Sequence, residues 1–388
     1  MWRHVASNFL TFLVVIVFLL AGVILWGQSR YHAEGPLEGA ICLRVERGST
    51  MRAVSRELQE RGAISSGALL RIAADYSGKE DRLKAGSWLI PEHASMAEVL
   101  DIITRGGASS CGTEVVYRIG VNRTRVDVRE RDPQSEAYVE VAEFDLPQDT
   151  QAEAPPAAYG ERLARPDTRY RINVAEGVTS WQVVRALEAI EVLSGEIGEI
   201  PPEGSLAPHD YEVERGDSRA ALVERMMQLQ KARLAAAWEA RDPDLPLESP
   251  AEVLILASLI EKETGIPEER RKVASVFVNR LRRGMRLQTD PAVIYGITNG
   301  QGVLGRGLRQ SELRRVTPYN TYVIEGLPPT PIANPGEASL MAAVNPEKTD
   351  YLFFVADGSG GHAFAATLEE HNRNVARWRR IESERNAQ

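Results

Sequence analysis

The chain has 388 residues, of which 43% are hydrophobic and 26% are charged, and its formal net charge is -8. This composition is typical of globular proteins, and the length allows two or three domains with their own cores. The acidic balance argues against a general nucleic-acid binder, and the lack of Cys-x-x-Cys and His-Glu-x-x-His spacings argues against a zinc site.

An almost wholly apolar segment, Phe9–Trp26, lies near the N-terminus. A helix of this length spans about 27 Å, which matches the hydrocarbon core of a bilayer. A cleaved signal peptide is the alternative, but no Ala-x-Ala-like site follows the segment. We therefore expect a short cytoplasmic N-terminus at residues 1–8 and a retained transmembrane anchor at residues 9–27, with Trp2 and Trp26 at the interfaces.

Charge does not fix the orientation of this anchor, because Arg3 precedes it and Arg30 follows it. Two cysteines, Cys42 and Cys111, flank the first soluble segment. In an oxidising compartment they can form a disulfide, whereas two unpaired buried thiols are the alternative.

Residues 38–107 are predicted to form a small α+β module. Its expected elements alternate or repeat with the periods of strands and helices: a strand at Ile41–Val45, helices at Met51–Arg61 and Ser66–Tyr76, a turn and strand at Leu83–Ile90, and a helix at Met96–Thr104. This order resembles a LysM-like module, a class that binds glycans containing N-acetylglucosamine. A small adaptor without a ligand is the alternative.

The middle of the chain carries little recognisable chemistry. Residues 108–170 are predicted to be a β-rich insertion of three strands, with a mobile acidic loop at Pro147–Pro156. Residues 171–248 are predicted to hold a second small module, with a helix at Ser180–Ala189, and linking helices that include the amphipathic Ser218–Glu239.

The chemistry is concentrated in residues 249–388. Ser249 and Pro250 are helix-start signals, and an apolar run follows them as far as Ile260. The run ends in Glu261-Lys262-Glu263-Thr264, and Gly265 and Pro267 end the helix. A carboxyl group beside apolar residues has a raised pKa, which allows it to act as a proton donor near neutral pH.

Only one of these two glutamates is expected to face apolar neighbours. Glu261 and Glu263 are separated by about 200° around the helix axis, so they point into different surroundings. Glu263 lies over Leu256, Leu259 and Ile260, whereas Glu261 lies over a smaller and more polar set. Glu263 is therefore the preferred acid and Glu261 the fallback. The alternative is that Glu263 is an ordinary solvated or salt-bridged glutamate at a helix end, without a catalytic role.

Polar and aromatic residues follow in loops that suit a sugar ligand. Amides bond to hydroxyl groups, and tyrosine rings pack on the apolar face of a sugar ring, although turns that merely connect elements have similar composition. The arginines and lysine of residues 270–286 form a local basic cluster, which indicates either a solvated helix face or attraction of an anionic polymer. A strand at Tyr351–Val355, a Gly-rich turn and a second strand are expected to form a hairpin.

Several ordered motifs of this region resemble the MltG (YceG-like) endolytic murein transglycosylases. They are Ala257–Thr264, Lys272–Leu281, Gly284–Pro291, Tyr319–Tyr322, Gly326–Pro329, Pro331–Gly336, Tyr351–Gly358 and Gly361-His362. The close match covers about residues 250–372. The anchor and the LysM-like module match the family in arrangement, and residues 107–170 look like an insertion that short members lack.

This resemblance implies an enzyme of the cell wall that needs no cofactor or metal. Such an enzyme cleaves the β-1,4 bond between N-acetylmuramic acid and N-acetylglucosamine in nascent glycan strands without adding water, and leaves 1,6-anhydromuramoyl ends. One glutamate performs both proton transfers, and the family's glutamate falls on Glu263. The resemblance also implies contact with peptidoglycan synthases (penicillin-binding proteins), an inner-membrane location and a body in the periplasm.

The remaining site residues are hypotheses about substrate binding. Saccharide and N-acetyl contacts are expected from Asn279, Gln288, Tyr319, Asn320, Tyr322 and Asn334. Carboxylates of the substrate would meet Arg280 and Arg286, and Asp290 would orient a neighbour. The alternatives to a lytic transglycosylase are a non-catalytic glycan-binding scaffold for cell-wall synthesis enzymes and a tethered hydrolase. We predict an α+β fold with an N-terminal transmembrane helix, a LysM-like α+β module and a C-terminal mixed α+β catalytic domain.

Overall fold

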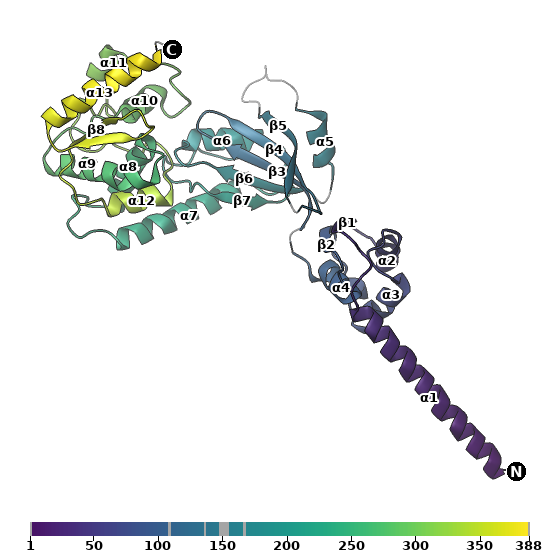
Figure 1. Cartoon of the computed structure of the whole chain (residues 1–388). Coiled ribbons are helices and arrows are strands. Elements are labelled where there is room, and N and C mark those ends of the chain that lie inside the picture. Colours follow the sequence, from purple (N-terminus) through teal and green to yellow (C-terminus); the bar gives the residue numbers. More distant parts are fainter. Residues whose placement is uncertain (1, 108–109, 136, 147–154, 166–167, 387–388) are drawn as a thin grey trace. The chain divides into compact units, whose positions relative to one another are not determined.

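The computed structural model describes residues 2–107, 110–135, 137–146, 155–165 and 168–386, which are a mixture of helices and strands (Figure 1). The fold is therefore α+β, as predicted. The chain divides into two compact units. The first comprises Met1–Val115, Asp127–Glu143 and Pro155–Arg169, and the second comprises Val116–Val126, Phe144–Ala154 and Tyr170–Gln388.

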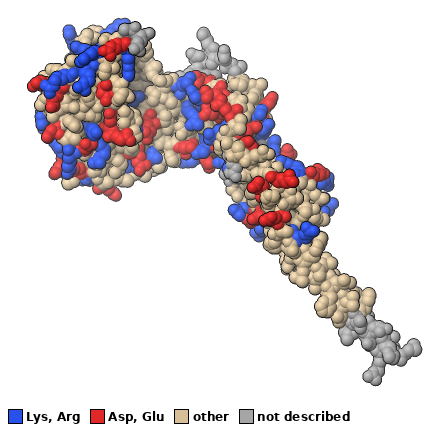
Figure 2. Space-filling model, viewed as in Figure 1, with Lys and Arg blue, Asp and Glu red and all other residues tan. Residues whose placement is uncertain are grey.

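The first unit begins with the helix α1, Trp2–His32. Its segment Phe12–His32 is long and apolar enough to cross a membrane, and this segment is not buried inside the protein. No Lys, Arg, Asp or Glu occurs between Phe12 and Ser29, and Figure 2 accordingly shows the described part of α1 in tan until it approaches the folded module. Tyr31, at the end of α1, packs against the core of that module.

The predicted module has the expected order of elements. They are β1 (Ile41–Val45), α2 (Met51–Glu60), α3 (Gly67–Tyr76), the short 3-10 helix η1 (Glu80–Arg82), β2 (Gly86–Ile90) and α4 (Met96–Arg105). The strands β1 and β2 are antiparallel, with Leu43 opposite Trp88. Side chains of Ser66 and Ser95 cap α3 and α4 by accepting backbone N–H bonds, which fixes where both helices begin.

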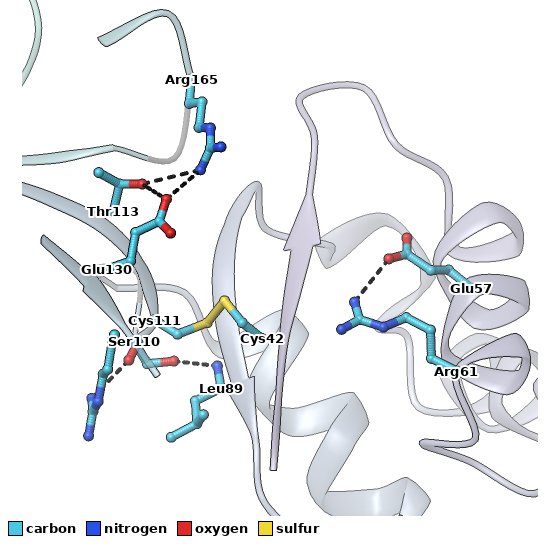
Figure 3. Close-up of a disulfide and its surroundings, with 10 residues drawn as sticks. Cys42, Glu57, Arg61, Leu89, Ser110, Cys111, Thr113, Glu130 and Arg165 are labelled. Atoms are coloured by element: carbon cyan, nitrogen blue, oxygen red, sulfur yellow. Dashed lines mark hydrogen bonds and ion pairs between the residues drawn. A yellow bond between two sulfur atoms is a disulfide. The ribbon is translucent and has the colours of Figure 1, made fainter. Parts of the chain in front are cut away.

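A disulfide settles the question that the sequence left open. Cys42 of β1 is bonded to Cys111, which lies 69 residues further along the chain. Figure 3 shows that Ser110, next to this bridge, also bonds the backbone of β2: its Oγ accepts the Leu89 N–H at 2.8 Å. The bridge closes a long loop around the module, and such a cross-link stabilises a fold by about 2–4 kcal/mol.

The strands predicted for residues 108–170 form, but they do not make a sheet of their own. The elements of this part are β3 (Gly112–Ile119), β4 (Thr124–Arg131), β5 (Tyr138–Asp145), α5 (Ala157–Leu163), β6 (Arg169–Val174), α6 (Ser180–Ala189) and β7 (Asp210–Val213). Their five strands lie in one sheet in the order β5-β4-β3-β6-β7, so the expected division at residue 170 does not separate two sheets. Most of the predicted acidic loop, 147–154, lies outside the described residues.

The C-terminal part of the second unit is a helical body with one hairpin. Its elements are α7 (Arg219–Glu239), α8 (Pro250–Glu263), the 3-10 helix η2 (Pro267–Glu269), α9 (Arg270–Arg282), α10 (Asp290–Thr298), α11 (Gln310–Arg314), α12 (Glu337–Val344), β8 (Phe353–Ala356), β9 (His362–Ala365) and α13 (Leu368–Asn386). The strands β8 and β9 form the predicted antiparallel hairpin, and α13 contacts both of them.

Helix α8 lies at the centre of this body, in contact with α7, α9, α10 and α12 (Figure 1). Its apolar side chains, including Val253, Leu256 and Leu259, have no exposed surface. They share one core with Phe277 of α9 and Leu340 of α12. Because close packing leaves α8 little freedom, the residues at its C-terminal end are held in fixed positions.

Candidate active site

The start and end of α8 are fixed as the sequence predicts. The Ser249 side chain caps the helix by accepting the Glu252 N–H at 3.3 Å, and Pro250 occupies the first position. The helix ends at Glu263, and Thr264 is already extended. Glu263 therefore sits in the last turn of a buried helix, where it is partly shielded from water.

Burial raises the pKa of Glu263 to about 6. The negative charge of Asp290 acts in the same direction, whereas the Thr289 hydroxyl and the charges of His362 and Arg280 lower the pKa. Within the described chain Glu263 has no salt bridge, so no arginine clamps it. This carboxyl group can therefore be protonated near neutral pH and is free to exchange its proton.

Thr289 is a candidate site residue that sequence reasoning missed. It is only 1% exposed, and its Oγ1 has no partner with hydrogen-bond geometry among the described residues. The hydroxyl lies close enough to Glu263 to lower its pKa, although the pair falls short of a regular bond. A buried hydroxyl without a partner is costly, and here it is directed at the proposed acid.

The loop that carries Thr289 is tied down from two sides. Arg280 Nη1 donates to Leu287 O at 2.6 Å, and Thr321 Oγ1 both accepts the Thr289 N–H and donates to Thr289 O. Between these anchors Gln288 adopts a φ of 51°, a left-handed conformation that non-glycine residues seldom adopt. The side chain of Gln288 is exposed, as a substrate ligand must be.

Asp290 and Tyr322 form a pair beside Glu263. The Tyr322 hydroxyl donates to Asp290 Oδ1 at 2.6 Å, and both groups interact electrostatically with Glu263. Arg286 Nη1 donates to Tyr322 O at 3.2 Å, and its side chain is otherwise exposed. The predicted residues Asp290 and Tyr322 therefore lie beside the proposed acid, and Arg286 is attached to the backbone of Tyr322 with a side chain that a ligand can reach.

A second missed residue, His362, comes from the β8–β9 hairpin. Its Nδ1 lies 2.8 Å from Glu269 Oε2, and Glu269 Oε1 accepts the His362 backbone N–H. A Cβ atom on Gly361 would lie 2.6 Å from Glu269 Oε1, so a larger residue here would force the Glu269 carboxylate to move. The hairpin is thereby held against the segment that follows α8, which brings the charge of His362 close to Glu263.

Three predicted saccharide ligands are engaged with the backbone of the protein itself. Their amide donors bond to carbonyl oxygens: Asn279 Nδ2 to Thr349 O (2.8 Å) and Tyr351 O (3.0 Å), Asn320 Nδ2 to Arg315 O (2.7 Å), and Asn334 Nδ2 to Val178 O (2.9 Å). Asn320 and Asn334 are completely buried. In this conformation Asn320 and Asn334 present no atom to a substrate, whereas Asn279 is partly exposed. We propose that all three position the loops.

Arg280 and Tyr319 also differ from their expected surroundings. Arg280 is 6% exposed and donates to Leu352 O and Leu287 O at 2.6 Å each, so it acts on Glu263 through its charge and on the loop through its bonds. Tyr319 packs beside Tyr295, with ring centroids 5.1 Å apart, and its hydroxyl lies 2.8 Å from Thr330 Oγ1.

Glu261, the fallback acid, faces a closed environment. Its side chain is 5% exposed, and its Oε2 accepts the Gly336 N–H at 3.0 Å. Arg270 Nη2 lies 3.8 Å from Glu261 Oε1 and 3.3 Å from Glu176 Oε2. Arg270, whose side chain is 11% exposed, is thus paired with carboxylates and does not belong to the basic surface expected from the sequence.

Among the described residues no three His, Cys, Asp or Glu side chains are arranged to hold a metal ion. The end of α8 offers a carboxyl group with a raised pKa, near the Thr289 hydroxyl, the Asp290–Tyr322 pair, Arg280 and His362.

The model of the YceG-like family matches residues 126–377, which is well over half of the chain. The chain belongs to the YceG-like family. The match includes Glu263 and every other site residue named above, whereas α1 and the module of residues 38–107 lie outside it.

The similarity to curated relatives extends over most of the chain. An "Endolytic murein transglycosylase" of Bacillus subtilis (strain 168) is 27% identical over 356 residues, which cover 92% of this chain and 89% of the relative. A protein of the same name from Streptococcus pneumoniae (serotype 2, strain D39) is 26% identical over 391 residues, covering 96% of this chain and 65% of the relative.

A solved structure is also similar to the chain. It is a putative yceG-like protein from Listeria monocytogenes, with 23% identity and a TM-score of 0.44, and the similarity covers 87% of this chain and 99% of that one.

Proposed function

We propose that this protein is a membrane-anchored lytic transglycosylase that cleaves the β-1,4 bond between N-acetylmuramic acid and N-acetylglucosamine within nascent glycan strands. Membership of the YceG-like family and the names of its curated relatives support murein as the substrate class. The observation that carries the mechanism is Glu263, a partly buried and unclamped acid with a pKa of about 6.

Glu263 performs both proton transfers in this proposal. With a pKa of about 6, roughly a tenth of the molecules carry the proton at pH 7. The protonated group donates to the leaving glycosidic oxygen, and the resulting carboxylate then accepts the proton of the C6 hydroxyl, which closes onto C1. A hydrolase of the ordinary type needs two carboxylates in defined positions, and this second step replaces the attacking water.

Neighbouring groups assist these steps in distinct ways. Gln288, Arg286 and Tyr322 have the exposed or partly exposed atoms that a saccharide or its lactyl and peptide carboxylates would contact. The charges of Arg280 and His362 lower the pKa of Glu263 and so stabilise its carboxylate after donation. The buried Thr289 hydroxyl would bond to the acid when substrate excludes water.

Two features of the first unit support the proposed location. The apolar helix α1 can serve as the anchor, and the Cys42–Cys111 disulfide supports an oxidising compartment for the folded body. Together they favour a single-pass protein of the inner membrane with its body in the periplasm. Contact with peptidoglycan synthases stays a prediction from the resemblance, as does glycan binding by the LysM-like module.

Product analysis in oxygen-18 water tests the proposed reaction. The full-length protein in nanodiscs is incubated with nascent, uncrosslinked glycan, and the new ends are weighed by mass spectrometry. We expect 1,6-anhydro ends without the heavy oxygen. Ends that are heavier by one labelled water would show a hydrolase, and a lack of new ends would favour the non-catalytic scaffold.

A further inference from the structure

Helix α3 (Gly67–Tyr76) has two apolar faces, and only one of them is packed. Leu70 and Ala74 point into the module and have no exposed surface. At 100° per residue, Leu69, Ile72 and Tyr76 fall within an arc of about 60° on another side of the helix. We call these three residues the outer stripe.

The outer stripe is open along most of its length. Leu69 is partly buried, but Ile72 is 66% exposed and Tyr76 is 93% exposed. Single exposed apolar residues are common on proteins. A row at helical spacing that continues from a contact with another helix requires an explanation, because polar residues would serve better on a water-facing surface.

The outer stripe begins where α1 ends. α1 contacts both α3 and α4, and these two helices lie beside its C-terminal end in Figure 1. A Cβ atom on Gly27 would lie 3.7 Å from Leu69 Cδ1, so the two helices meet closely at this point. Val23 and Ile24, which lie within about 60° of Gly27 around the axis of α1, are 65% and 59% exposed. Their apolar surface therefore continues onto α3.

The position of Gly27 sets the level of this contact in a bilayer. If Phe9–Trp26 fills the hydrocarbon core, Gly27 lies at its boundary. Leu69 touches α1 at that level, and Tyr76, seven residues later, lies about 10 Å further along α3. Tyrosine is enriched at membrane interfaces because its ring is apolar and its hydroxyl is polar.

We propose that the outer stripe inserts into the interfacial region of the lipid bilayer and holds the module of residues 38–107 on the membrane surface. The proposal rests on the proposed anchoring by α1. Lipid is the favoured occupant because the outer stripe adjoins the membrane-span candidate Phe12–His32, whose most apolar window is not buried inside the protein. A second copy of the chain is the competing occupant.

Spin-label accessibility in the full-length protein tests this insertion. Nitroxide labels are attached to three single variants, Tyr76→Cys, Leu19→Cys in α1 and Arg47→Cys in the exposed turn after β1, with the native disulfide kept intact. The protein is placed in nanodiscs of phosphatidylethanolamine and phosphatidylglycerol. Collisions of each label with molecular oxygen, which concentrates in lipid, are compared with collisions with a water-soluble nickel chelate.

We expect the label at residue 76 to show an oxygen-to-nickel ratio several-fold above that of the label at residue 47. A ratio equal to that at residue 47 would overturn the proposal, as would a label shielded from both reagents, since a protein would then cover the outer stripe. The label at residue 19 distinguishes a failure of the proposed anchoring by α1 from a failure of the proposed insertion of the outer stripe. If it is nickel-accessible, the anchoring itself fails. If it is in lipid while residue 76 is in water, only the present inference fails.

Discussion

Two regions at the end of α8 place a glutamate in different surroundings. On one side Glu261 is held by the Gly336 N–H and lies near Arg270. On the other side Glu263 has no salt bridge within the described residues, although it lies near two cationic side chains. The two glutamates are only two residues apart, and the direction each takes from the helix decides its surroundings.

This difference shows how one short motif supplies both structure and chemistry. The region of Glu261 joins α8 to α9 and to the loop before α12, and its carboxylate meets groups that compensate its charge. The region of Glu263 leaves a carboxyl group partly desolvated, which costs stability when it ionises and makes it a better proton donor. Substitutions of Glu261 and of Glu263 should therefore change different properties of the protein, stability in the first case and proton transfer in the second.

The largest stability effect is expected from Glu261→Ala. The substitution leaves the Gly336 N–H without its acceptor and removes a negative charge near Arg270. A loss of about 2–3 kcal/mol follows from unsatisfied buried groups of this kind. Hydrogen exchange of the α8 amides measures it, with the exposed Glu268→Ala as a control. Protection equal to that of the wild type would show that this region is not structural.

Glu263→Gln is expected to increase the free energy of unfolding, by less than Glu261→Ala lowers it. The folded state raises the pKa of Glu263 from 4.5 to about 6, so its contribution to stability is complete below pH 4.5 and is lost as the pH rises through about 6. The glutamine variant cannot lose this contribution. It should be more stable than the wild type by about 1–2 kcal/mol at pH 7.5 and equal to it at pH 4.

Thermal or urea unfolding of the C-terminal body at both pH values measures this difference. A variant that is destabilised at pH 7.5 would mean that the ionised carboxylate has a strong partner, which would contradict the proposed environment of Glu263.

The smallest effects are expected from the charges around Glu263, and they appear in the pH dependence of kcat/KM. Activity should fall as the pH rises through about 6, because the donor must be protonated. Asp290→Asn removes a charge that raises this pKa and should move the falling limb to lower pH, by less than about one unit. His362→Gln removes a charge that lowers it and should move the limb to higher pH. Shifts in the same direction would contradict this arrangement.

Local pattern in the sequence was enough to predict the bounds of α8, whereas the choice of Glu263 as the acid stays a prediction. The Ser249-Pro250 start, the apolar run and the helix period fix which side of α8 each glutamate faces, and the structure has the same boundaries. The order of elements in the module of residues 38–107 follows from the same kind of local signal.

Contacts between distant residues were not predictable in this way. The Glu269–His362 pair joins residues 93 positions apart, and the bond from Gly336 to Glu261 spans 75. The burial of Asn320 and Asn334 depends on how loops close over them, and composition does not distinguish a loop-closing amide from a ligand. The pairing of β3 to β5 with β6 and β7 in one sheet is likewise a long-range property.

The most direct test of the account compares Glu263→Gln with Glu261→Gln on the same nascent glycan, with both variants in nanodiscs at equal amounts of folded protein. The rate of formation of 1,6-anhydro ends is measured by mass spectrometry. The account predicts a loss of about 10²–10⁴-fold for Glu263→Gln and near wild-type activity per folded molecule for Glu261→Gln. Equal rates for Glu263→Gln and the wild type, or loss of activity only in folded Glu261→Gln, would contradict it.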